Sequence, residues 1–174
     1  MRTTVLIAFA AAVSLTGCGG DKASGGAVQT ASATPAPAAT VASAPDGRQV
    51  YQRCAVCHQA AGQGVPGTFP PLALSEWATA ASAALPIRVV LHGLQGPVTV
   101  KGQKFNGTMP AFGTGQPMND ADVAAVLTYV RSSWGNKAGA VSADSVAKER
   151  TATASQSAPW TAAQLAPLLG AGGH

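Results

Sequence analysis

The sequence predicts a small all-α domain between two flanks that have no core of their own. Segments that begin at Asp46 and at Asn119 repeat apolar residues at helical spacing, each behind a residue of the kind that caps a helix. Residues 85–92 have proline in the first turn and glycine just past the end, which is typical of a short helix. Because both flanks consist mainly of small residues, we expect the packed domain to occupy residues 46–135.

Residues 1–17 have the layout of a bacterial lipoprotein signal peptide. Arg2 precedes an apolar run, Val5–Val13, that is too short for a confident membrane span. Leu-Thr-Gly-Cys18 resembles a lipobox, in which cleavage leaves the cysteine as a lipidated N-terminus. We therefore expect lipid on Cys18 and a position on the periplasmic face of a bacterial membrane. The alternative is an ordinary secreted protein in which Cys18 is incidental.

Residues 18–45 predict a flexible tether behind that lipid. They contain almost no large apolar side chains, so they cannot bury enough surface to offset the entropy of ordering. The formal charge of the whole sequence is only +4 and is spread along it, without the basic runs that indicate nucleic-acid binding.

The first helix carries the sequence Cys54-Ala-Val-Cys57-His58. On a helix these three side chains project from one face, because they are three and four residues apart. Two thiols followed at once by an imidazole are what covalent attachment of a c-type haem requires, each sulfur bonding the porphyrin and the histidine binding iron. The motif predicts one covalently attached haem c per chain.

A redox dithiol and a zinc site are the alternatives for this motif. Zinc needs further ligands, but the other cysteine is Cys18, and His92 and His174 form no second ligand pair. A thioredoxin-like site needs a strand before the cysteines, whereas the residues around Tyr51 predict a helix. Both alternatives are weaker than haem.

Residues 61–71 predict a loop, since they include three glycines and three prolines. The nitrogen of His58 that faces away from the iron needs a hydrogen-bond acceptor, and we expect a backbone carbonyl of the Phe69–Pro71 corner to supply it. Residues 75–84 are rich in alanine and predict a helix capped by Ser75, and residues 96–107 predict a small hairpin.

Met109 is the candidate for the second axial ligand of the iron. Methionine is most often core filler, but a low-spin electron carrier that already uses His58 needs a second strong-field ligand, and a thioether favours ferrous iron. Pro110 fixes the backbone beside it. Met118, just before the last core helix, and His92 are the rival ligands.

The last core helix begins at Asn119 and ends at Gly135. Beyond it, residues 136–174 form a low-complexity extension in which Ser142 and Thr161 are candidate caps of two further helices. A disordered tail is the alternative.

Taken together, these residues resemble a class I c-type cytochrome over residues 46–135. The resemblance rests on the Cys54–His58 motif, the proline corner, the Met109-Pro110 pair and the last helix. It implies a cytochrome c fold in which the first and last core helices cross around one haem. The residues at that crossing would be Gly47, Tyr51, Val126 and Tyr129.

A closer similarity is to cytochrome subunits or domains that serve quinoprotein dehydrogenases or are fused to copper nitrite reductases. It rests on residues 91–96, 105–110 and 129–136. Since the sequence has no copper domain, the resemblance implies a separate partner: a quinoprotein dehydrogenase, a reductase or a terminal oxidase.

We therefore expect an electron-transfer protein rather than an enzyme, with iron cycling between Fe(II) and Fe(III) inside an apolar shell. Its expected members are Phe69, Leu72, Leu91 and Phe105. The alternatives are a haem enzyme and a haem-based sensor or ligand-binding module, both of which need an open distal site.

Overall fold

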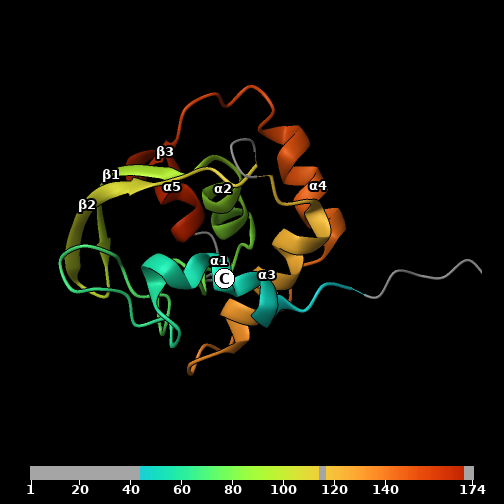
Figure 1. The fold of residues 1–174 in the computed structure, drawn as a ribbon. Coiled ribbons are helices and arrows are strands. Elements are labelled where there is room, and N and C mark those ends of the chain that lie inside the picture. Colours follow the sequence, from blue (N-terminus) through green and yellow to red (C-terminus); the bar gives the residue numbers. More distant parts are fainter. Residues whose placement is uncertain (1–43, 114–116, 171–174) are drawn as a thin grey trace, which may run out of the picture. The chain divides into compact units, whose positions relative to one another are not determined.

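The computed structural model describes residues 44–113 and 117–170. The predicted signal peptide, Cys18 and most of the tether lie outside these residues. Within them, no helix has the length and apolar character needed to cross a membrane. The elements in chain order are α1 (Gly47–His58), α2 (Ala84–His92), β1 (Leu94–Val100), β2 (Gln103–Met109), α3 (Asp120–Ser132), α4 (Ala143–Ala152), β3 (Trp160–Thr161) and α5 (Ala162–Leu169) (Figure 1).

α1 and α3 begin at the caps that the sequence predicts. The side chain of Asp46 accepts a hydrogen bond from the Arg48 amide (2.9 Å), and that of Asn119 accepts one from the Asp122 amide (2.8 Å). The two acidic residues in the first turn of α3 also favour its positive end.

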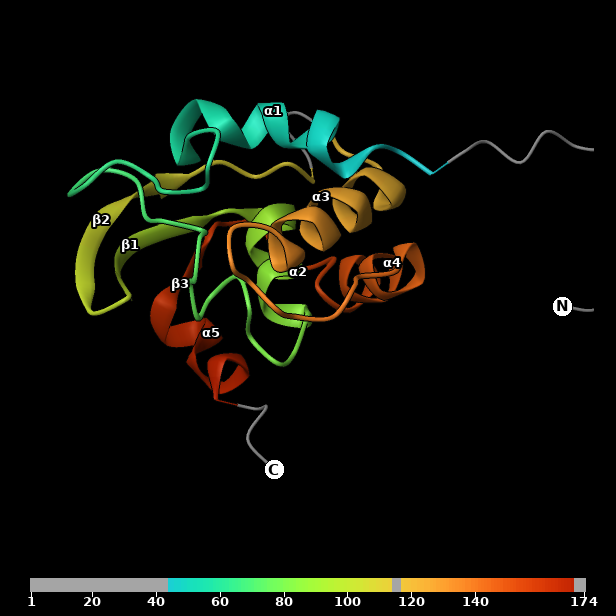
Figure 2. The same ribbon diagram turned by 90° about the horizontal axis from the view of Figure 1, so that it is seen from below.

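α1 and α3 cross at the point that the resemblance implies. A Cβ atom on Gly47 would overlap the backbone carbonyl of Ala125, so only glycine allows the two helices to come this close. Tyr51 is 1% exposed, and its ring centroid lies 5.5 Å from that of Tyr129 and 4.9 Å from that of Trp134. Figure 2 shows the two helices side by side.

The expected helices are present, but an all-α fold is not confirmed, because the described residues also include a three-stranded sheet in the order β2-β1-β3. The hairpin expected over residues 96–107 is present and extends further, over residues 94–109. β1 and β2 pair antiparallel from Leu94 opposite Met109 to Val100 opposite Gln103. Lys101 and Gly102 form its turn, both with positive φ (52° and 75°), as two-residue hairpin turns require. Met109 therefore ends a strand.

The predicted helix over residues 75–84 is wrong. Residues 76–78 form a turn and residue 79 a bend instead, and α2 begins only at Ala84. The guanidinium of Arg131, which is 3% exposed, donates to the carbonyls of Ala78 (3.0 Å) and Ala80 (2.9 Å). These carbonyls are therefore used by a distant side chain, which offsets the helical preference of the alanines.

Two helices lie in the extension where the sequence places their caps. The Ser142 side chain accepts from the Ser145 amide, and Thr161 forms a capping box with Gln164. α4 contacts α2 and α3, whereas α5 contacts β1 and α2 (Figure 2). Val146 of α4 and Leu165 of α5 are completely buried.

Candidate functional site

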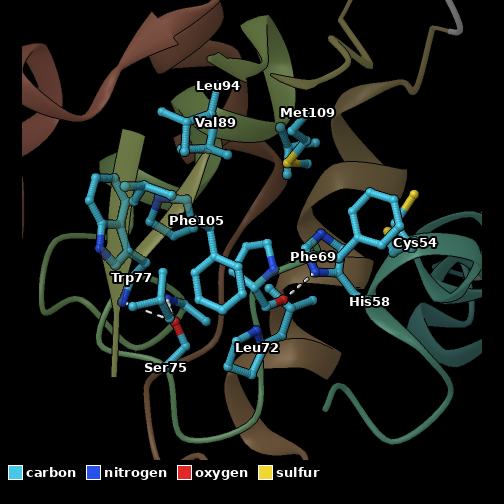
Figure 3. A pocket seen from close by; sticks show the side chains of 18 of the residues that line it. Cys54, His58, Phe69, Leu72, Ser75, Trp77, Val89, Leu94, Phe105 and Met109 are labelled. Carbon is cyan, nitrogen blue, oxygen red and sulfur yellow. Dashed lines mark hydrogen bonds between the residues drawn. The ribbon is translucent and has the colours of Figure 1, made fainter. Parts of the chain in front are cut away.

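An apolar cavity of about 170 Å³ lies between α1, α2, α3, the hairpin and the loop after α1. His58 reaches it from the end of α1 and Met109 from the end of β2, with the Met109 sulfur directed into the cavity (Figure 3). Cys54 and Cys57 belong to the same lining. The structure thus brings together all four residues that the sequence singles out for haem.

The two thiols lie one helical turn apart and form no disulfide. Burial raises the pKa of the Cys54 thiol to about 11, although the nearby Arg53 acts in the opposite direction. A redox-active dithiol needs a lowered thiol pKa, so this environment does not favour the dithiol alternative. Among residues 44–113 and 117–170, no group of three or more His, Cys, Asp or Glu side chains could hold a metal ion, which leaves the zinc alternative without a ligand set there.

His58 is 8% exposed, and its Nδ1 lies 2.9 Å from the carbonyl oxygen of Pro70. A carbonyl can only accept, so Nδ1 carries the proton and Nε2 keeps a free lone pair. Burial lowers the pKa of His58, while the bond to Pro70 raises it. The prediction that the proline corner supplies the acceptor is confirmed, and a neutral imidazole held in this tautomer suits a metal ligand.

The loop after α1 brings Pro70 to this position by folding back on itself. The Val65 amide donates to the Phe69 carbonyl (2.8 Å), and the Gly64 amide donates to the His58 carbonyl (2.9 Å). Gly64 has a φ of 67°, and a Cβ atom there would overlap the Phe69 carbonyl. Glycine is therefore required where the loop passes over itself.

Neither rival ligand lines the cavity. Met118 is 2% exposed and belongs to a cluster of buried core residues that includes Val123 and Leu127. His92 turns towards the extension, where its Nε2 lies 2.7 Å from the Thr153 hydroxyl. Of the three residues considered for the second axial position, only Met109 belongs to the lining.

Of the predicted apolar shell, Phe69, Leu72 and Phe105 line the cavity. Leu91 does not, and it packs instead in the core cluster behind α2. Its neighbour Val90 takes part in the lining. Val90 and Leu91 are neighbours on α2, and the sequence alone could not tell which of the two faces the cavity.

Asn136 fixes part of this wall, a role that no local sequence pattern predicts. Its amide group donates to the carbonyls of Leu72 (3.0 Å) and Val130 (2.7 Å), and its oxygen accepts from the Leu74 amide (2.7 Å). Asn136 is 5% exposed and lies beyond the last residue of α3, outside any helical repeat that would mark it as buried.

The residues present fit a c-type haem. The cavity wall is apolar, two thiols stand at its edge, and a neutral imidazole and a thioether come from different elements around it. The imidazole and the thioether are the donors that haem iron takes in electron carriers, and the thiols can bond the porphyrin.

A sequence model of the cytochrome c family matches residues 44–134. Cytochrome c-552 of Thermus thermophilus is 45% identical over 94 residues, which cover 52% of this chain and 70% of that protein. The cytochrome c subunit of the quinone-dependent alcohol dehydrogenase of Gluconacetobacter polyoxogenes is 32% identical over 110 residues, or 63% of this chain and 23% of the subunit. For the fructose dehydrogenase cytochrome subunit of Gluconobacter japonicus the identity is 32% over 116 residues, covering 64% and 23%. The chain thus spans less than a quarter of these dehydrogenase subunits.

Proposed function

Because the chain belongs to the cytochrome c family, it carries covalently bound haem c and serves in electron transfer, and we propose that Cys54, Cys57, His58 and Met109 hold that haem. Cys54 and Cys57 would form the two thioether bonds. His58 would bind the iron through Nε2, and Met109 through its sulfur. The observation that carries this proposal is the meeting of a fixed, neutral His58 and of Met109 in one apolar cavity.

When bound, the haem supplies a one-electron Fe(II)/Fe(III) couple. The Pro70 carbonyl holds the ring of His58 in one orientation and raises its basicity as a ligand. Phe69, Leu72 and Phe105 keep water out, which limits the solvent reorganisation that accompanies a change of charge. Met109 would supply a second ligand to the iron, and this favours an electron carrier over a haem enzyme or a sensor with an open distal site.

The partner we propose is a dehydrogenase that delivers electrons to this chain, with a reductase or a terminal oxidase as the acceptor. Several relatives are cytochrome subunits of dehydrogenases, which supports the first part of that proposal. Lys101 and Lys104 are exposed at the hairpin turn and could steer an acidic partner surface.

We also propose that lipid on Cys18 anchors the mature chain to the periplasmic face of a membrane. The lipobox-like residues before Cys18 and the tether of residues 19–45 support this location. Such an anchor would confine the carrier to the surface on which a membrane-bound partner works.

Intact-mass analysis of the full chain, produced in a bacterium that matures c-type cytochromes, tests the haem and lipid attachments together. After acid denaturation, we expect the mature protein to retain the mass of one haem and of the acyl groups on Cys18. The double variant Cys54→Ala/Cys57→Ala should lose the covalent haem and keep the lipid, whereas Cys18→Ser should do the reverse. Release of haem from the denatured wild type would contradict the proposed attachment.

Co-purification from detergent-solubilised membranes tests the partner. We expect the wild type to be isolated with a dehydrogenase whose substrate reduces its haem. A haem that stays oxidised when that substrate is added would contradict this assignment.

A further inference from the structure

Two segments far apart in sequence cap the C-terminal end of α2. The last carbonyls of a helix have no partner within the helix and need one elsewhere. Here the Phe112 amide donates to the Val90 carbonyl (2.9 Å) and the Gly113 amide to the Leu91 carbonyl (2.9 Å). One residue past the helix, the Gly93 carbonyl accepts from the Trp160 amide (3.0 Å). The segment that follows Met109 and the extension thus meet at the same helix end.

Gly93 is the residue between them. Its φ is 81°, and a Cβ atom there would overlap the backbone carbonyl of Met109. The backbone of Met109 therefore lies directly on Gly93, whose own carbonyl is bound by Trp160. The next residue, Leu94, also lies between Met109 and Trp160. In the sheet it pairs with Met109 of β2 on one side and with Trp160 of β3 on the other.

The extension also binds the segment that follows Met109 at a second place, near Met118. Arg150 of α4 donates through Nη2 to the Met118 carbonyl (3.0 Å) and through Nε to the Asp120 carboxylate (2.8 Å). The Met118 amide in turn donates to the Phe112 carbonyl (2.8 Å). Arg150 thus joins α4 directly to Met118, and Met118 in turn is bonded to Phe112.

The extension is itself fixed to α2, so it can act as a rigid support. Arg88 and Glu149 form an ion pair (2.7 Å), and the guanidinium carbon of Arg88 lies 5.9 Å from the Trp160 ring centroid. The rings of His92 and Trp160 meet edge to face, with centroids 6.2 Å apart. All these residues of the extension lie beyond Trp134, where the match to the cytochrome c family ends.

We propose that residues 142–169 form a brace that keeps Met109 in place as an iron ligand, with Trp160 and Arg150 as its positioning residues. The inference rests on the proposed function, in which Met109 binds the iron. A ligand at the end of an edge strand is easily exchanged unless its backbone is fixed, because each opening of the segment exposes the iron to competitors. Trp160 fixes Gly93 and Leu94 beside Met109, and Arg150 fixes Met118 and Asp120 beyond it.

Imidazole titration of the oxidised, haem-loaded full chain measures this bracing. Imidazole competes with Met109 for the iron, so its apparent affinity reports how readily Met109 leaves. The thioether-to-iron charge-transfer band at the red end of the visible spectrum gives a second readout.

Trp160→Ala keeps the amide that bonds Gly93 but loses the ring contacts with Arg88 and His92 that hold this amide in place. We expect it to bind imidazole about two- to tenfold more tightly than the wild type, the range for loss of an aromatic contact. Arg150→Ala should shift the affinity in the same direction.

Trp134→Ala is the matched control. Its indole is also half-buried in an aromatic cluster, but it packs on Tyr51 of α1 and Tyr129 of α3 and not on α2. We expect this variant to unfold more easily and yet to bind imidazole as the wild type does. An equal gain of imidazole affinity in Trp134→Ala and Trp160→Ala, or no gain in Trp160→Ala and Arg150→Ala, would overturn the brace.

The outcomes also separate the brace from the function on which it rests. If the oxidised wild type lacks the charge-transfer band, Met109 is not the ligand, and both proposals fall. If the band is present but imidazole affinity is unchanged in both Trp160→Ala and Arg150→Ala, only the brace is wrong. Should Trp160→Ala not accumulate as a folded haem protein, Trp160→Phe and Arg150→Ala decide, and wild-type affinity in both overturns the brace.

Discussion

Three polar side chains show how single residues shape this domain. Both His58 and Asn136 are nearly buried, and each has partners that fix its orientation: the Pro70 carbonyl for the imidazole, and the two carbonyls and one amide bonded by Asn136. Leaving a buried polar group without a partner costs about 1–3 kcal/mol, so these hydrogen bonds fix the positions of the residues that form the cavity wall. His92 is the third, and it links α2 to α4.

The lowered pKa of His92 predicts that the domain loses stability at acidic pH. The Thr153 hydroxyl donates its own proton to the Glu149 carbonyl (2.6 Å), so its oxygen accepts a hydrogen bond from Nε2–H of His92. Burial lowers the pKa of His92, Arg150 and Arg88 act in the same direction, and a hydrogen bond with the Gln156 backbone opposes them. Because the unfolded chain then takes up the proton first, stability is lost as the pH falls through about 6.5 and is kept above it.

His92→Gln tests this dependence, since glutamine can still donate to Thr153 but does not titrate. We expect the free energy of unfolding of the wild type to fall more steeply than that of the variant between about pH 7 and pH 5. Urea unfolding at a series of pH values measures both. Parallel curves for the two proteins would rule out His92 as the titrating group.

The crossing of α1 and α3 positions many of the residues that line the cavity. α1 carries the two thiols and His58, and α3 contributes Val126, Leu127 and Val130 to the opposite wall of the cavity. The two helices can come this close only because residue 47 has no side chain. Their distance therefore sets the width of the cavity.

Gly47→Ala should destabilise the protein by about 1–3 kcal/mol, because the new methyl group overlaps the Ala125 carbonyl and must push the helices apart. Gly139→Ala is the control, as a Cβ atom there meets nothing within 4 Å. Chemical denaturation of both variants measures the difference. Equal stability of the two variants would show that the crossing is looser than described.

Helices could be predicted from sequence wherever their signals are local. Asp46, Asn119, Ser142 and Thr161 cap helices in the structure, because a cap and an apolar repeat are properties of neighbouring residues. The strand β3 has no such local signal, since it exists through pairing with β1. The helix expected over residues 75–84 was wrong for the same kind of reason, because Arg131 takes up the carbonyls from a distance.

At the scale of the whole molecule, the site depends on contacts between distant segments. The motif Cys54–His58 could be recognised directly, and chemical reasoning singled out Met109. The sequence could not show that Gly93 separates Met109 from Trp160, or that Arg150 binds the Met118 carbonyl. These contacts join residues far apart along the chain, and no local pattern encodes them.

Arg131 joins three parts of the molecule. Its guanidinium bonds the turns at Ala78 and Ala80, and its Nε donates to the Gly139 carbonyl (2.8 Å) at the start of the extension. Arg131→Met, which keeps a long side chain, should cost on the order of 3 kcal/mol because charged hydrogen bonds are lost and buried carbonyls are left unpaired. Thermal unfolding checks this value, and an unchanged midpoint would contradict it.

The spectrum of the oxidised protein tests the central claim most directly. If His58 and Met109 bind the iron of an electron carrier, the wild type shows the thioether-to-iron charge-transfer band and Met109→Ala does not. Met118→Leu, a replacement of similar volume in the core, should keep the band. A wild type without the band, or a Met109→Ala variant that retains it, would contradict the account.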